Sequence, residues 1–536
     1  MIKIENLSFR YPTREEYALQ NINLEIKKGE FVLLTGSTGC GKTTLLKCLN
    51  GIIPHESSGE LGGNVWIDGM DTREQPINIL AQKVGLVFQN PDEQLFSTRV
   101  LDEVAFGLEN LCCPWEEMRA RIEWALAKVG MAAYQNHSTN ALSGGQKQRV
   151  AVASLLALQP EILVLDEPIS QLDPSGAQGV LEVVKKLSDD GITIILVEHR
   201  IHEVAAWADR IVVMDKGRIE LNILSEEVGE HLDTFQTLGL RSPRGNNDFK
   251  VRLQEAASAA VNPVRTMAKT RKAQKKKDLE TPRPALGNEQ GKKAKKLVEV
   301  SDLWFSYDKK KAKNKAECTL KGLDLNIYAG EIVGVLGENG SGKTTLMQHL
   351  AGLHRPQKGR VSIEGKDTAK YDAYRLAGTV GILFQNPSLM LTCDTVYEEV
   401  AFGPRNLKMG KEEIAARVGR CLNLMELEEL RVCHPQTLSG GQRLRCAAST
   451  ILSMSPEVIL LDEPTSGQDI LHIRKLMVLC QELVKQGKAV VMITHDFEIA
   501  AEYCDRIIVL SNGNIVLECR PQEILGSCAP AGASLI

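Results

Sequence analysis

Short apolar runs alternate with longer helix-like stretches along most of the chain. The runs have the length and unbroken apolar character of strands covered on both faces, and they lie at residues 31–35, 162–165, 192–197, 211–214, 332–336, 458–461, 489–493 and 507–510. Strands that alternate with helices in this way are typical of parallel sheets flanked by helices. The pattern therefore predicts the α/β fold class.

None of these runs is long enough to cross a membrane. The longest, such as residues 192–197, fall far short of the roughly 18 to 20 apolar residues that a membrane span needs. The first residues, Met1 to Glu5, alternate apolar and polar side chains, which predicts a strand and not a signal or transit peptide. We therefore expect a chain without a membrane span that is located in the cytoplasm.

The chain contains an internal duplication. Short motifs recur in the same order, and five residue pairs share a separation of 296 positions: Tyr11 and Tyr307, Gln89 and Gln385, Ser143 and Ser439, Glu167 and Glu463, His199 and His495. A constant offset predicts two homologous domains. We expect these domains at 1–235 and 297–536, with a linker at 236–296.

Charge distinguishes the linker from the rest of the chain. Residues 244–297 hold 15 Lys and Arg against 5 Asp and Glu, whereas the whole chain has a net charge of −4. We expect a basic, flexible segment because it lacks apolar periodicity. Three roles stay open for it: a solvated tether, contact with anionic lipid headgroups, or contact with nucleic acid. No aromatic residues are interleaved with its lysine clusters to stack on bases.

Composition excludes several other classes of protein. With 43% hydrophobic and 25% charged residues, the chain does not resemble a fibrous or disordered protein. Its 13 cysteines are odd in number and include no C-x-x-C pair. We therefore expect reduced, structural cysteines, with neither a disulfide framework nor a zinc site.

Two glycine-rich loops have the chemistry of phosphate binding. Residues 36–44 read GSTGCGKTT and residues 337–345 read GENGSGKTT, and each loop follows an apolar run. The glycines let backbone N–H groups face a phosphate at a helix N-terminus, while the lysine neutralises the outer phosphate oxygens. The first threonine presents a hydroxyl to Mg²⁺. Both loops therefore predict binding of a nucleoside triphosphate with Mg²⁺.

An acidic pair ends one apolar run in each half. These pairs are Asp166 with Glu167, and Asp462 with Glu463. In a parallel sheet the carboxyl ends of the strands lie beside the phosphate loop. The first acid suits indirect coordination of Mg²⁺, and the second can orient and deprotonate the attacking water.

The octets LSGGQKQR at 142–149 and LSGGQRLR at 438–445 complete the set of motifs. A serine and two glycines at a helix start form a second phosphate-binding edge. Together with the phosphate loops and the acidic pairs, the octets resemble the ATP-binding cassette (ABC) superfamily over nearly all of the chain outside the linker. The resemblance implies two P-loop NTPase domains of ABC type in tandem. Each would have a RecA-like parallel-sheet core, an antiparallel β subdomain and a helical signature subdomain.

The resemblance also implies how the two halves cooperate. In this family two cassettes close head to tail around two ATP molecules, and each cassette lends its octet to the other. The octet that begins at Leu438 would complete the site of Lys42 and Glu167. The octet that begins at Leu142 would complete the site of Lys343. We therefore expect the two cassettes of the chain to pair with each other.

The expected site residues fall into three groups. The catalytic group comprises the water-activating glutamates, the γ-phosphate-sensing histidines and the Q-loop glutamines: Glu167, Glu463, His199, His495, Gln89 and Gln385. The ATP-binding group comprises the adenine-stacking tyrosines, the phosphate loops and the octets: Tyr11, Gly36, Ser37, Thr38, Gly39, Cys40, Gly41, Lys42, Thr43, Thr44, Ser143, Gly144, Gly145, Gln146, Tyr307, Gly337, Glu338, Asn339, Gly340, Ser341, Gly342, Lys343, Thr344, Thr345, Ser439, Gly440, Gly441 and Gln442. The Mg²⁺ group comprises Thr43, Gln89, Asp166, Thr344, Gln385 and Asp462.

Two residues depart from the usual pattern of the family. Ile169 stands where a Thr is usual, and Gln468 stands where a Leu is usual in the D-loop that contains Asp469. Asp173 matches the other D-loop. Neither departure removes a ligand of phosphate, metal or water, so we expect both sites to hydrolyse ATP.

The loops after the two glutamines indicate the subfamily. QNPDEQLF at 89–96, QNPSLML at 385–391 and VEHR at 197–200 resemble the ATPases of energy-coupling factor (ECF) transporters, which import vitamins and cobalt or nickel ions. The resemblance implies two membrane partners, a transmembrane scaffold (T) subunit and a small substrate-binding (S) subunit, and no specific nucleic acid. It also implies a peripheral location at the cytoplasmic face of the membrane. The apolar loop residues expected to be exposed in a groove for scaffold helices, unless they simply pack between subdomains, are Leu95, Phe96, Leu389 and Met390.

The expected function is therefore that of an ATP-hydrolysing motor for ECF-type import of a vitamin or a transition-metal ion. Two alternatives share the superfamily: a soluble translation factor with two cassettes that acts on the ribosome, and a tandem sugar-importer ATPase. The linker of such a translation factor is a long helical hairpin, which Pro263, Pro282 and Pro284 disfavour here. The sequence NPDEQLF at 90–96 argues against the sugar importer.

Overall fold

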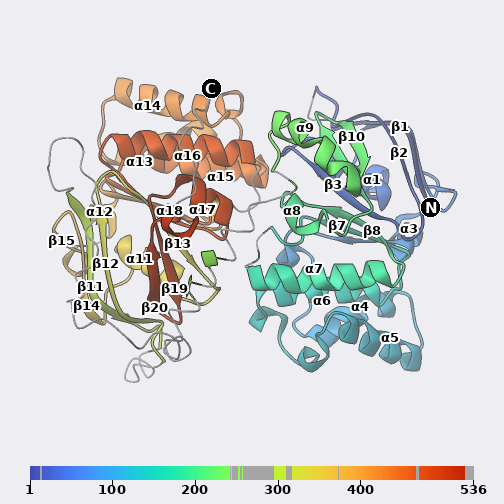
Figure 1. The fold of residues 1–536 in the computed structure, drawn as a ribbon. Helices are drawn as coiled ribbons and strands as arrows, with labels where there is room; N and C mark the ends of the chain where they lie inside the picture. The colour runs from blue at the N-terminus through green and yellow to red at the C-terminus, as the bar shows by residue number, and fades with distance from the viewer. Residues whose placement is uncertain are drawn as a thin grey trace. The chain divides into compact units, whose positions relative to one another are not determined.

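The computed structural model describes two compact units of the chain (Figure 1). The first consists of Met1–Gly245 with Asp469–Leu471, and the second of Asn246–Gln468 with His472–Ile536. The described residues are 1–12, 15–170, 172, 174–241, 243, 252–253, 256–257, 295–308, 317–371, 373–465 and 470–525. Most of the basic linker, the D-loop acids Asp173 and Asp469, and Gln468 lie outside them.

The first unit is built on a six-stranded sheet. Its order is β10-β9-β3-β8-β7-β6, and every strand is parallel to its neighbours except β10, which is antiparallel to β9. The strands are β3 (Phe31–Gly36), β6 (Val84–Val87), β7 (Ile162–Asp166), β8 (Thr193–Val197), β9 (Arg210–Asp215) and β10 (Arg218–Leu224). The four apolar runs predicted in this half are confirmed as strands, and β8 begins one residue later than the run.

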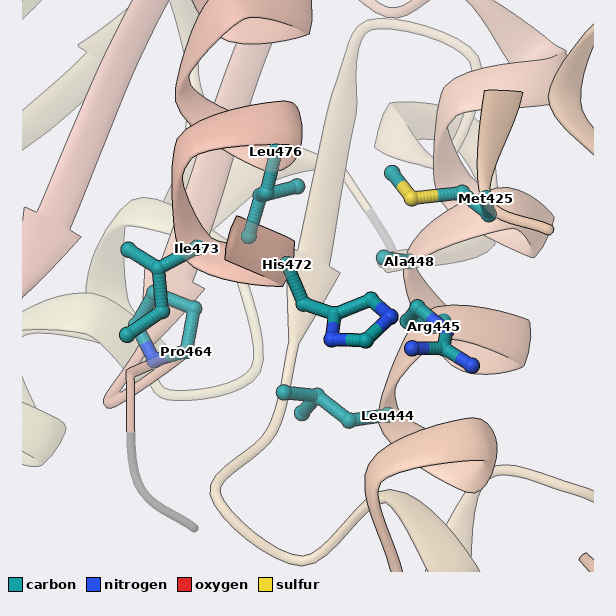
Figure 2. A pocket seen from close by; sticks show the side chains of 8 residues that line it. All are labelled: Met425, Leu444, Arg445, Ala448, Pro464, His472, Ile473 and Leu476. Carbon is teal, nitrogen blue, oxygen red and sulfur yellow. The ribbon is translucent and has the colours of Figure 1, made fainter. Parts of the chain in front are cut away.

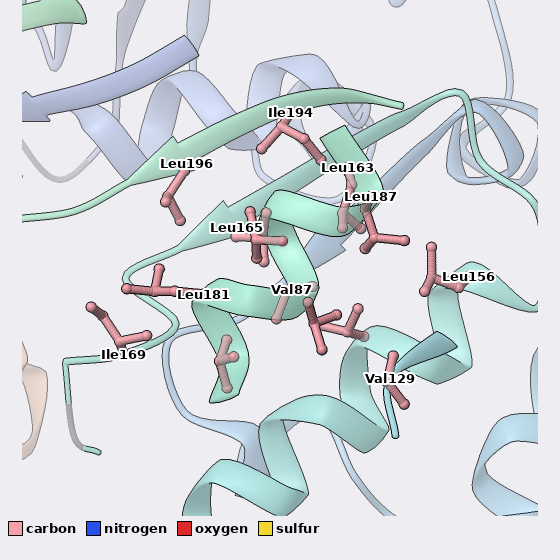
Figure 3. Close-up of a cluster of buried hydrophobic side chains, with 14 of the residues drawn as sticks. Val87, Val129, Leu156, Leu163, Leu165, Ile169, Leu181, Leu187, Ile194 and Leu196 are labelled. Atoms are coloured by element: carbon pink, nitrogen blue, oxygen red, sulfur yellow. The ribbon is translucent and has the colours of Figure 1, made fainter. Parts of the chain in front are cut away.

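Both faces of this sheet are buried, which explains why its strands are apolar without alternation. Along β7, Leu163 and Leu165 belong to one apolar cluster, which Figure 3 shows packed against helices, whereas Ile162 and Val164 belong to the cluster on the opposite face. The helices of this unit are α1 (Lys42–Leu49), α2 (Ile52–His55), α3 (Ile77–Lys83), α4 (Val100–Asn110), α5 (Trp115–Lys128), α6 (Gly144–Leu156), α7 (Pro174–Asp189), α8 (Ile201–Val204) and α9 (Leu232–Thr237).

A smaller antiparallel sheet completes the first unit. Its order is β2-β1-β4-β5, with β1 (Ile2–Arg10), β2 (Leu19–Ile26), β4 (Glu60–Ile67) and β5 (Met70–Asp71). Burial alternates along β2, where Ile22, Leu24 and Ile26 are buried and the residues between them are exposed. Because β1 begins at Ile2, the strand expected at the N-terminus is confirmed.

The second unit repeats this architecture. Its core sheet has the order β16-β17-β18-β13-β19-β20, and its antiparallel sheet has the order β12-β11-β14-β15. The strands are β11 (Lys296–Phe305), β12 (Leu320–Tyr328), β13 (Ile332–Gly337), β14 (Lys358–Ile363), β15 (Lys366–Asp367), β16 (Val380–Leu383), β17 (Val458–Asp462), β18 (Ala489–Ile493), β19 (Arg506–Ser511) and β20 (Asn514–Cys519). The helices are α11 (Lys343–Leu350), α12 (Ala373–Leu376), α13 (Val396–Asn406), α14 (Lys411–Leu424), α15 (Gly440–Met454), α16 (Ile470–Lys485), α17 (Phe497–Tyr503) and α18 (Pro521–Leu525).

None of the helices in the described part of the chain is both long and apolar enough to span a bilayer.

Candidate functional site

The phosphate loop of the first unit joins β3 to α1 in a shape that only glycine permits. Gly36 and Gly41 have positive φ angles of 152° and 105°. A Cβ added to Gly36 would lie 2.1 Å from the carbonyl oxygen of Met214, and one added to Gly41 would lie 2.3 Å from that of Ala18. The close turn leads directly into the N-terminus of α1, where free backbone N–H groups favour an anion.

The lysine of each loop is buried and held against the glycines. Lys42 Nζ donates hydrogen bonds to the carbonyl oxygens of Gly36 and Ser37, both at 2.9 Å. Lys343 makes the same two bonds in the second unit, at 2.8 and 2.9 Å. Each ammonium group is therefore fixed where it can neutralise the phosphates that the loop binds.

Oxygen ligands suited to Mg²⁺ lie beside each loop. Thr43 Oγ1 donates to Asp166 Oδ2 at 2.7 Å, and Thr344 hydrogen-bonds Asp462 in the same way. Burial, reinforced by the charge of Glu167, raises the pKa of Asp166 to about 6, and the pKa of Asp462 is raised to about 6 by the same causes. Two crowded carboxyls with a nearby hydroxyl fit Mg²⁺, because a divalent cation would compensate for the lost hydration, and also for the smaller repulsion, that raise these pKa values.

Glu167 lies at the centre of the predicted catalytic residues of the first unit. Its Oε1 is 3.0 Å from His199 Nε2, and its Oε2 accepts a hydrogen bond from Gln89 Nε2 at 2.9 Å. In the second unit Gln385 Nε2 donates to Glu463 Oε2 at 3.1 Å, and His495 Nε2 lies 3.1 Å from Glu463 Oε1 without the angle of a hydrogen bond. Residues far apart in the sequence thus meet at the carboxyl ends of adjacent strands, where the acidic pairs were expected.

The backbone at the two glutamates has an unusual conformation. Glu167 has a φ of 47° and Glu463 a φ of 51°. Residues other than Gly, Asn and Asp seldom adopt such a backbone conformation. In the first unit the Glu167 N–H donates to Val197 O at 3.0 Å, and Ser170 Oγ donates to Glu167 O at 3.0 Å. The same backbone conformation therefore occurs at equivalent positions of the two units.

The serine of each octet, called the signature serine from here on, is the N-cap of a helix, the signature helix. Ser143 caps α6 by accepting the Gln146 N–H at 3.4 Å, while Gln146 Oε1 accepts the Ser143 N–H at 2.9 Å. Ser439 and Gln442 form the same capping box on α15, at 3.3 and 2.9 Å. The structure therefore places each octet at the N-terminus of a helix, as predicted, and apart from the cluster around the glutamate.

The two tyrosines are attached to the phosphate-loop helices. Tyr11 Oη is 3.2 Å from Thr44 Oγ1, and Tyr307 Oη is 3.2 Å from Thr345 Oγ1. The Tyr307 side chain also donates to Gln348 Oε1 at 3.0 Å and is 61% exposed. An exposed ring tied to the phosphate loop suits the expected stacking on a base.

The expectation about the loops after the glutamines is half correct. Phe96 and Leu389 are exposed, at 62% and 78%. Leu95 is partly buried because it packs against the apolar core, and Met390 is partly buried, with its sulfur accepting the Phe384 N–H at 3.4 Å. The expectation that Leu95 and Met390 are exposed is therefore wrong.

A small pocket in the second unit is lined in part by the octet at 438–445 and by Pro464, which follows Glu463 (Figure 2). It lies between α15 and α16, where Glu426 forms ion pairs with His472, at 3.4 Å, and with Lys475. Its lining residues are Met425, Leu444, Arg445, Ala448, Pro464, His472, Ile473 and Leu476. Figure 2 shows a mostly apolar lining, which does not suit a triphosphate.

Sequence reasoning missed one residue beside the catalytic cluster. Glu198 is 1% exposed, and its carboxylate accepts the N–H groups of Ile169 and His199, both at 3.2 Å. The VEHR sequence had served only to indicate a subfamily. Comparison of the two halves would have revealed the position, because Thr465 and Thr494 occupy the places of Ile169 and Glu198 at the same offset.

Comparison with known proteins identifies the family. Residues 19–170 and 320–466, more than half of the chain, match the family described as ABC transporter. The chain belongs to the ABC transporter family. Both ABC matches begin in a strand of the antiparallel sheet and extend through the phosphate loop to just beyond the acidic pair.

Related ABC proteins match along nearly the whole chain. A protein of Methanosarcina mazei, provisionally named an ABC transporter ATP-binding protein, is 46% identical over 535 residues, which cover 98% of this chain and 90% of that protein. A Bacillus subtilis protein, provisionally named HMP/thiamine import ATP-binding protein YkoD, is 34% identical over 531 residues, covering 98% and 92%. The solved structure of cbiO1 from Clostridium perfringens, described as part of the ABC transporter complex cbiONQ, is 36% identical, with a TM-score of 0.40, and covers 45% of this chain and 96% of that one.

Membership of the ABC family establishes the coarse activity. The chain is a tandem ABC ATPase with two P-loop NTPase cassettes, and ATP is its substrate. The expected fold class and enzyme class are therefore confirmed, and so is the expected superfamily.

Proposed function

We propose that this ABC ATPase is the motor subunit of an ECF-type importer. It would drive uptake of a vitamin or a transition-metal ion through a separate scaffold subunit and a small substrate-binding subunit, from the cytoplasmic face of the membrane. The cassettes would comprise residues 1–235 and 297–536, joined by the basic linker 236–296. Transport of thiamine or its precursor is named for a relative that matches 98% of this chain, which supports an importer.

The cluster around each catalytic glutamate carries the proposal of hydrolysis. Gln89 and His199 contact the two oxygens of Glu167, which fixes the orientation of its carboxylate. Glu167 would deprotonate the water that attacks the γ-phosphate, and His199 would hold the carboxylate and contact that phosphate. Lys42 would stabilise the negative charge that develops on the transferred group. Thr43, Asp166 and Gln89 would hold Mg²⁺, which would neutralise part of the charge of the phosphates.

The proposed residues of the second site have the same roles. Glu463 would activate water, with His495 and Gln385 on its two oxygens. Thr344 and Asp462 would hold Mg²⁺. Because the geometry of the two clusters agrees closely, we propose that both sites hydrolyse ATP.

Each site would be completed by the signature serine of the other cassette. Ser143 and Ser439 are both N-caps whose helix starts can face an anion. Glycines directly follow each serine, so a phosphate can approach the backbone closely. We propose that ATP binding closes the cassettes on each other, and that hydrolysis and phosphate release part them.

The loops after the glutamines would transmit this motion to the scaffold. Phe96 and Leu389 present exposed apolar side chains in those loops. In the first unit the loop is also joined to the signature helix, because Lys147 Nζ lies 2.6 Å from Asp92 Oδ1 and Gln148 Nε2 donates to Phe88 O at 3.1 Å. A displacement of α6 would therefore move the surface that binds the scaffold.

Recovery of the chain from detergent-solubilised membranes tests this function. We expect two membrane proteins to co-purify, one with several membrane spans and one smaller, and we expect Phe96→Glu with Leu389→Glu to abolish their recovery without loss of ATP hydrolysis by the isolated chain. Leu224→Glu is the matched control, since Leu224 is 54% exposed on β10. Co-sedimentation with ribosomes, without any membrane partner, would contradict the proposal.

A further inference from the structure

A buried carboxylate in the first unit joins the two segments that carry the catalytic groups. Glu198 follows β8, and its backbone N–H donates to Leu34 O on β3 at 3.2 Å. Its Oε1 accepts the N–H of Ile169, two residues after the catalytic Glu167. Its Oε2 accepts the N–H of His199. One side chain therefore fixes the backbone on both sides of the contact between Glu167 and His199.

Burying such a carboxylate costs free energy unless hydrogen bonds replace its lost hydration. Burial, reinforced by the charge of Glu167, raises the pKa of Glu198 to about 8, although Arg200 and the hydrogen bond from Ile169 oppose the shift. Apolar packing surrounds its partner, since Ile169 is fully buried. The two backbone N–H groups are the compensation that the structure provides for the lost hydration.

The second unit solves the same problem with a different pair of residues. Thr494, in the place of Glu198, lies with its Oγ1 3.1 Å from Thr465 Oγ1, and Thr465 is in the place of Ile169. Thr494 Oγ1 also accepts the Asp496 N–H at 3.0 Å. Thr494 is fully buried. In one unit two hydroxyls join the segments to each other, and in the other a carboxylate bonded to the backbone does so.

We propose that Glu198 is a positioning residue for ATP hydrolysis in the first cassette: its carboxylate bridges the Ile169 and His199 N–H groups and so holds Glu167 and His199 in register. Ile169 and Glu198 act as a unit that replaces the threonine pair of the second cassette. Ile169 cannot accept or donate through its side chain, so the longer acceptor of Glu198 reaches its backbone instead. The two ATP sites of this chain are therefore supported by chemically different connections.

This inference rests on the proposed hydrolytic role of Glu167, and its test isolates that site. All variants carry Glu463→Gln, so that turnover reports the site of the first cassette. Steady-state hydrolysis of Mg-ATP gives kcat and KM for Glu198→Ala, Glu198→Gln and the double substitution Ile169→Thr with Glu198→Thr. Glu182→Gln, an exposed carboxylate on α7, is the control for loss of one charge.

The expected results follow from the number of acceptors that remain. Glu198→Ala loses both and should lower kcat about tenfold or more with KM for ATP within about twofold, because alignment and not binding is lost. Glu198→Gln keeps one acceptor oxygen but turns an amide N–H₂ toward the other backbone N–H. Above about pH 8, where the Glu198 carboxyl is ionised and both of its oxygens accept, the kcat of this variant should fall between those of the parent and the alanine variant. The double threonine substitution should restore kcat to within about threefold of the parent, since it rebuilds the pair of the second cassette.

Three results would overturn the inference. One is an unchanged kcat in a folded Glu198→Ala chain, and another is a double threonine variant no more active than Glu198→Ala. The third is a rise in KM that accounts for the whole loss. If the alanine variant does not fold, as judged by its far-ultraviolet circular dichroism, the inference is overturned by a Glu198→Gln chain with the kcat of the parent or by a double threonine variant no more active than Glu198→Gln. Turnover that persists with both Glu167→Gln and Glu463→Gln would instead refute the proposed hydrolytic role of Glu167, so the two failures are distinct.

Discussion

At the scale of single residues, the glutamates proposed to activate water combine an unusual backbone conformation with a side chain contacted on both oxygens. Glu167 has a φ of 47°, and His199 and Gln89 contact its two carboxylate oxygens. The strain is tolerated because strand β8 accepts the Glu167 N–H and Ser170 holds its carbonyl. A carboxylate fixed in this way costs little reorganisation when it accepts a proton from water.

Removing the carboxylates should separate binding from turnover. In Glu167→Gln with Glu463→Gln the amides keep the shape and much of the hydrogen bonding but are not bases. We expect ATP to bind as before and hydrolysis to fall by roughly 10² to 10⁴. Equilibrium binding of Mg-ATP and phosphate release measure the two effects, and hydrolysis at the parent rate would show that another group acts as the base.

The raised pKa of Glu198 predicts a dependence of stability on pH. Its pKa moves from an ordinary 4.5 to about 8 on folding, so between these values the folded chain holds a proton that the unfolded chain has released. The contribution to stability is fully present below the ordinary pKa and is lost as pH rises through the folded one. The charged groups that influence it are Glu167, Arg200 and Glu203.

We therefore expect the unfolding temperature of the parent to fall more between about pH 5 and about pH 8 than that of Glu198→Gln, whose amide does not titrate. Differential scanning calorimetry of both chains, with Glu182→Gln as control, measures the difference. Identical pH profiles for the parent and Glu198→Gln would contradict the burial of a protonated carboxyl.

Residues with a motif were predictable, and residues defined by what surrounds them were not. Lys42 and Glu167 occupy fixed places in motifs whose chemistry is known, and the structure puts them where those motifs require. Glu198 is part of no phosphate-binding or catalytic motif, and its role depends on the two N–H groups around it. Leu95 was expected to be exposed because its loop resembles a groove for scaffold helices, yet its apolar character lets it pack on the core.

At the scale of elements, the signature helix of the first unit depends on close packing between two glycines. A Cβ added to Gly145 on α6 would lie 2.9 Å from the Cα of Gly176 on α7, which is backbone and cannot turn aside. Gly179, one turn further along α7, has no atom within 4 Å of an added Cβ. The close approach of α6 and α7 therefore requires glycine at Gly145, whereas packing does not require glycine at Gly179.

Alanine substitutions at these glycines should have opposite effects on stability. Gly145→Ala forces the helices apart and should destabilise the chain by about 1–3 kcal/mol. Gly179→Ala gains helix propensity in free space and should stabilise it by about 0.5–1 kcal/mol. Thermal unfolding without nucleotide measures both shifts, and a Gly145→Ala chain as stable as the parent would refute the close contact.

Eight core strands could be predicted because their environment is uniform, whereas β6, β10, β16 and β20 were not among the predicted apolar runs. A strand covered on both faces needs apolar side chains at every position, so each run in the sequence marks its own boundaries to within a residue or two. The short helices were not predictable in this way. α8 (Ile201–Val204) and α2 (Ile52–His55) are single turns whose side chains carry no periodic signal.

At the scale of the whole molecule, the chain is a duplication whose halves have diverged at supporting positions. The two clusters around Glu167 and Glu463 agree to within 0.2 Å in their contacts, from 2.9 and 3.0 Å to 3.1 Å. The groups behind them differ, with a glutamate in one half and two threonines in the other. The two units share the contacts of the glutamate but differ in the residues that hold the neighbouring backbone. We therefore expect unequal rates of ATP hydrolysis at the two sites.

The central claim is that each ATP is bound between the phosphate loop of one cassette and the signature serine of the other. Ser143→Ala and Ser439→Ala are a matched pair, because both remove the same cap with nearly equal hydrogen bonds, at 3.4 and 3.3 Å. Losses of helix stability, about 1 kcal/mol each, should therefore be alike. Any difference between the two variants in hydrolysis then reports which site each serine serves.

Hydrolysis of Mg-ATP by these two variants tests the claim most directly. In a chain with Glu463→Gln, where Glu167 remains, we expect Ser439→Ala to lower turnover about tenfold more than Ser143→Ala, and we expect the order to reverse in a chain with Glu167→Gln. If Ser143→Ala instead has the larger effect on the site of Glu167, or if the two serines act equally in both backgrounds, each cassette works alone and the account is contradicted.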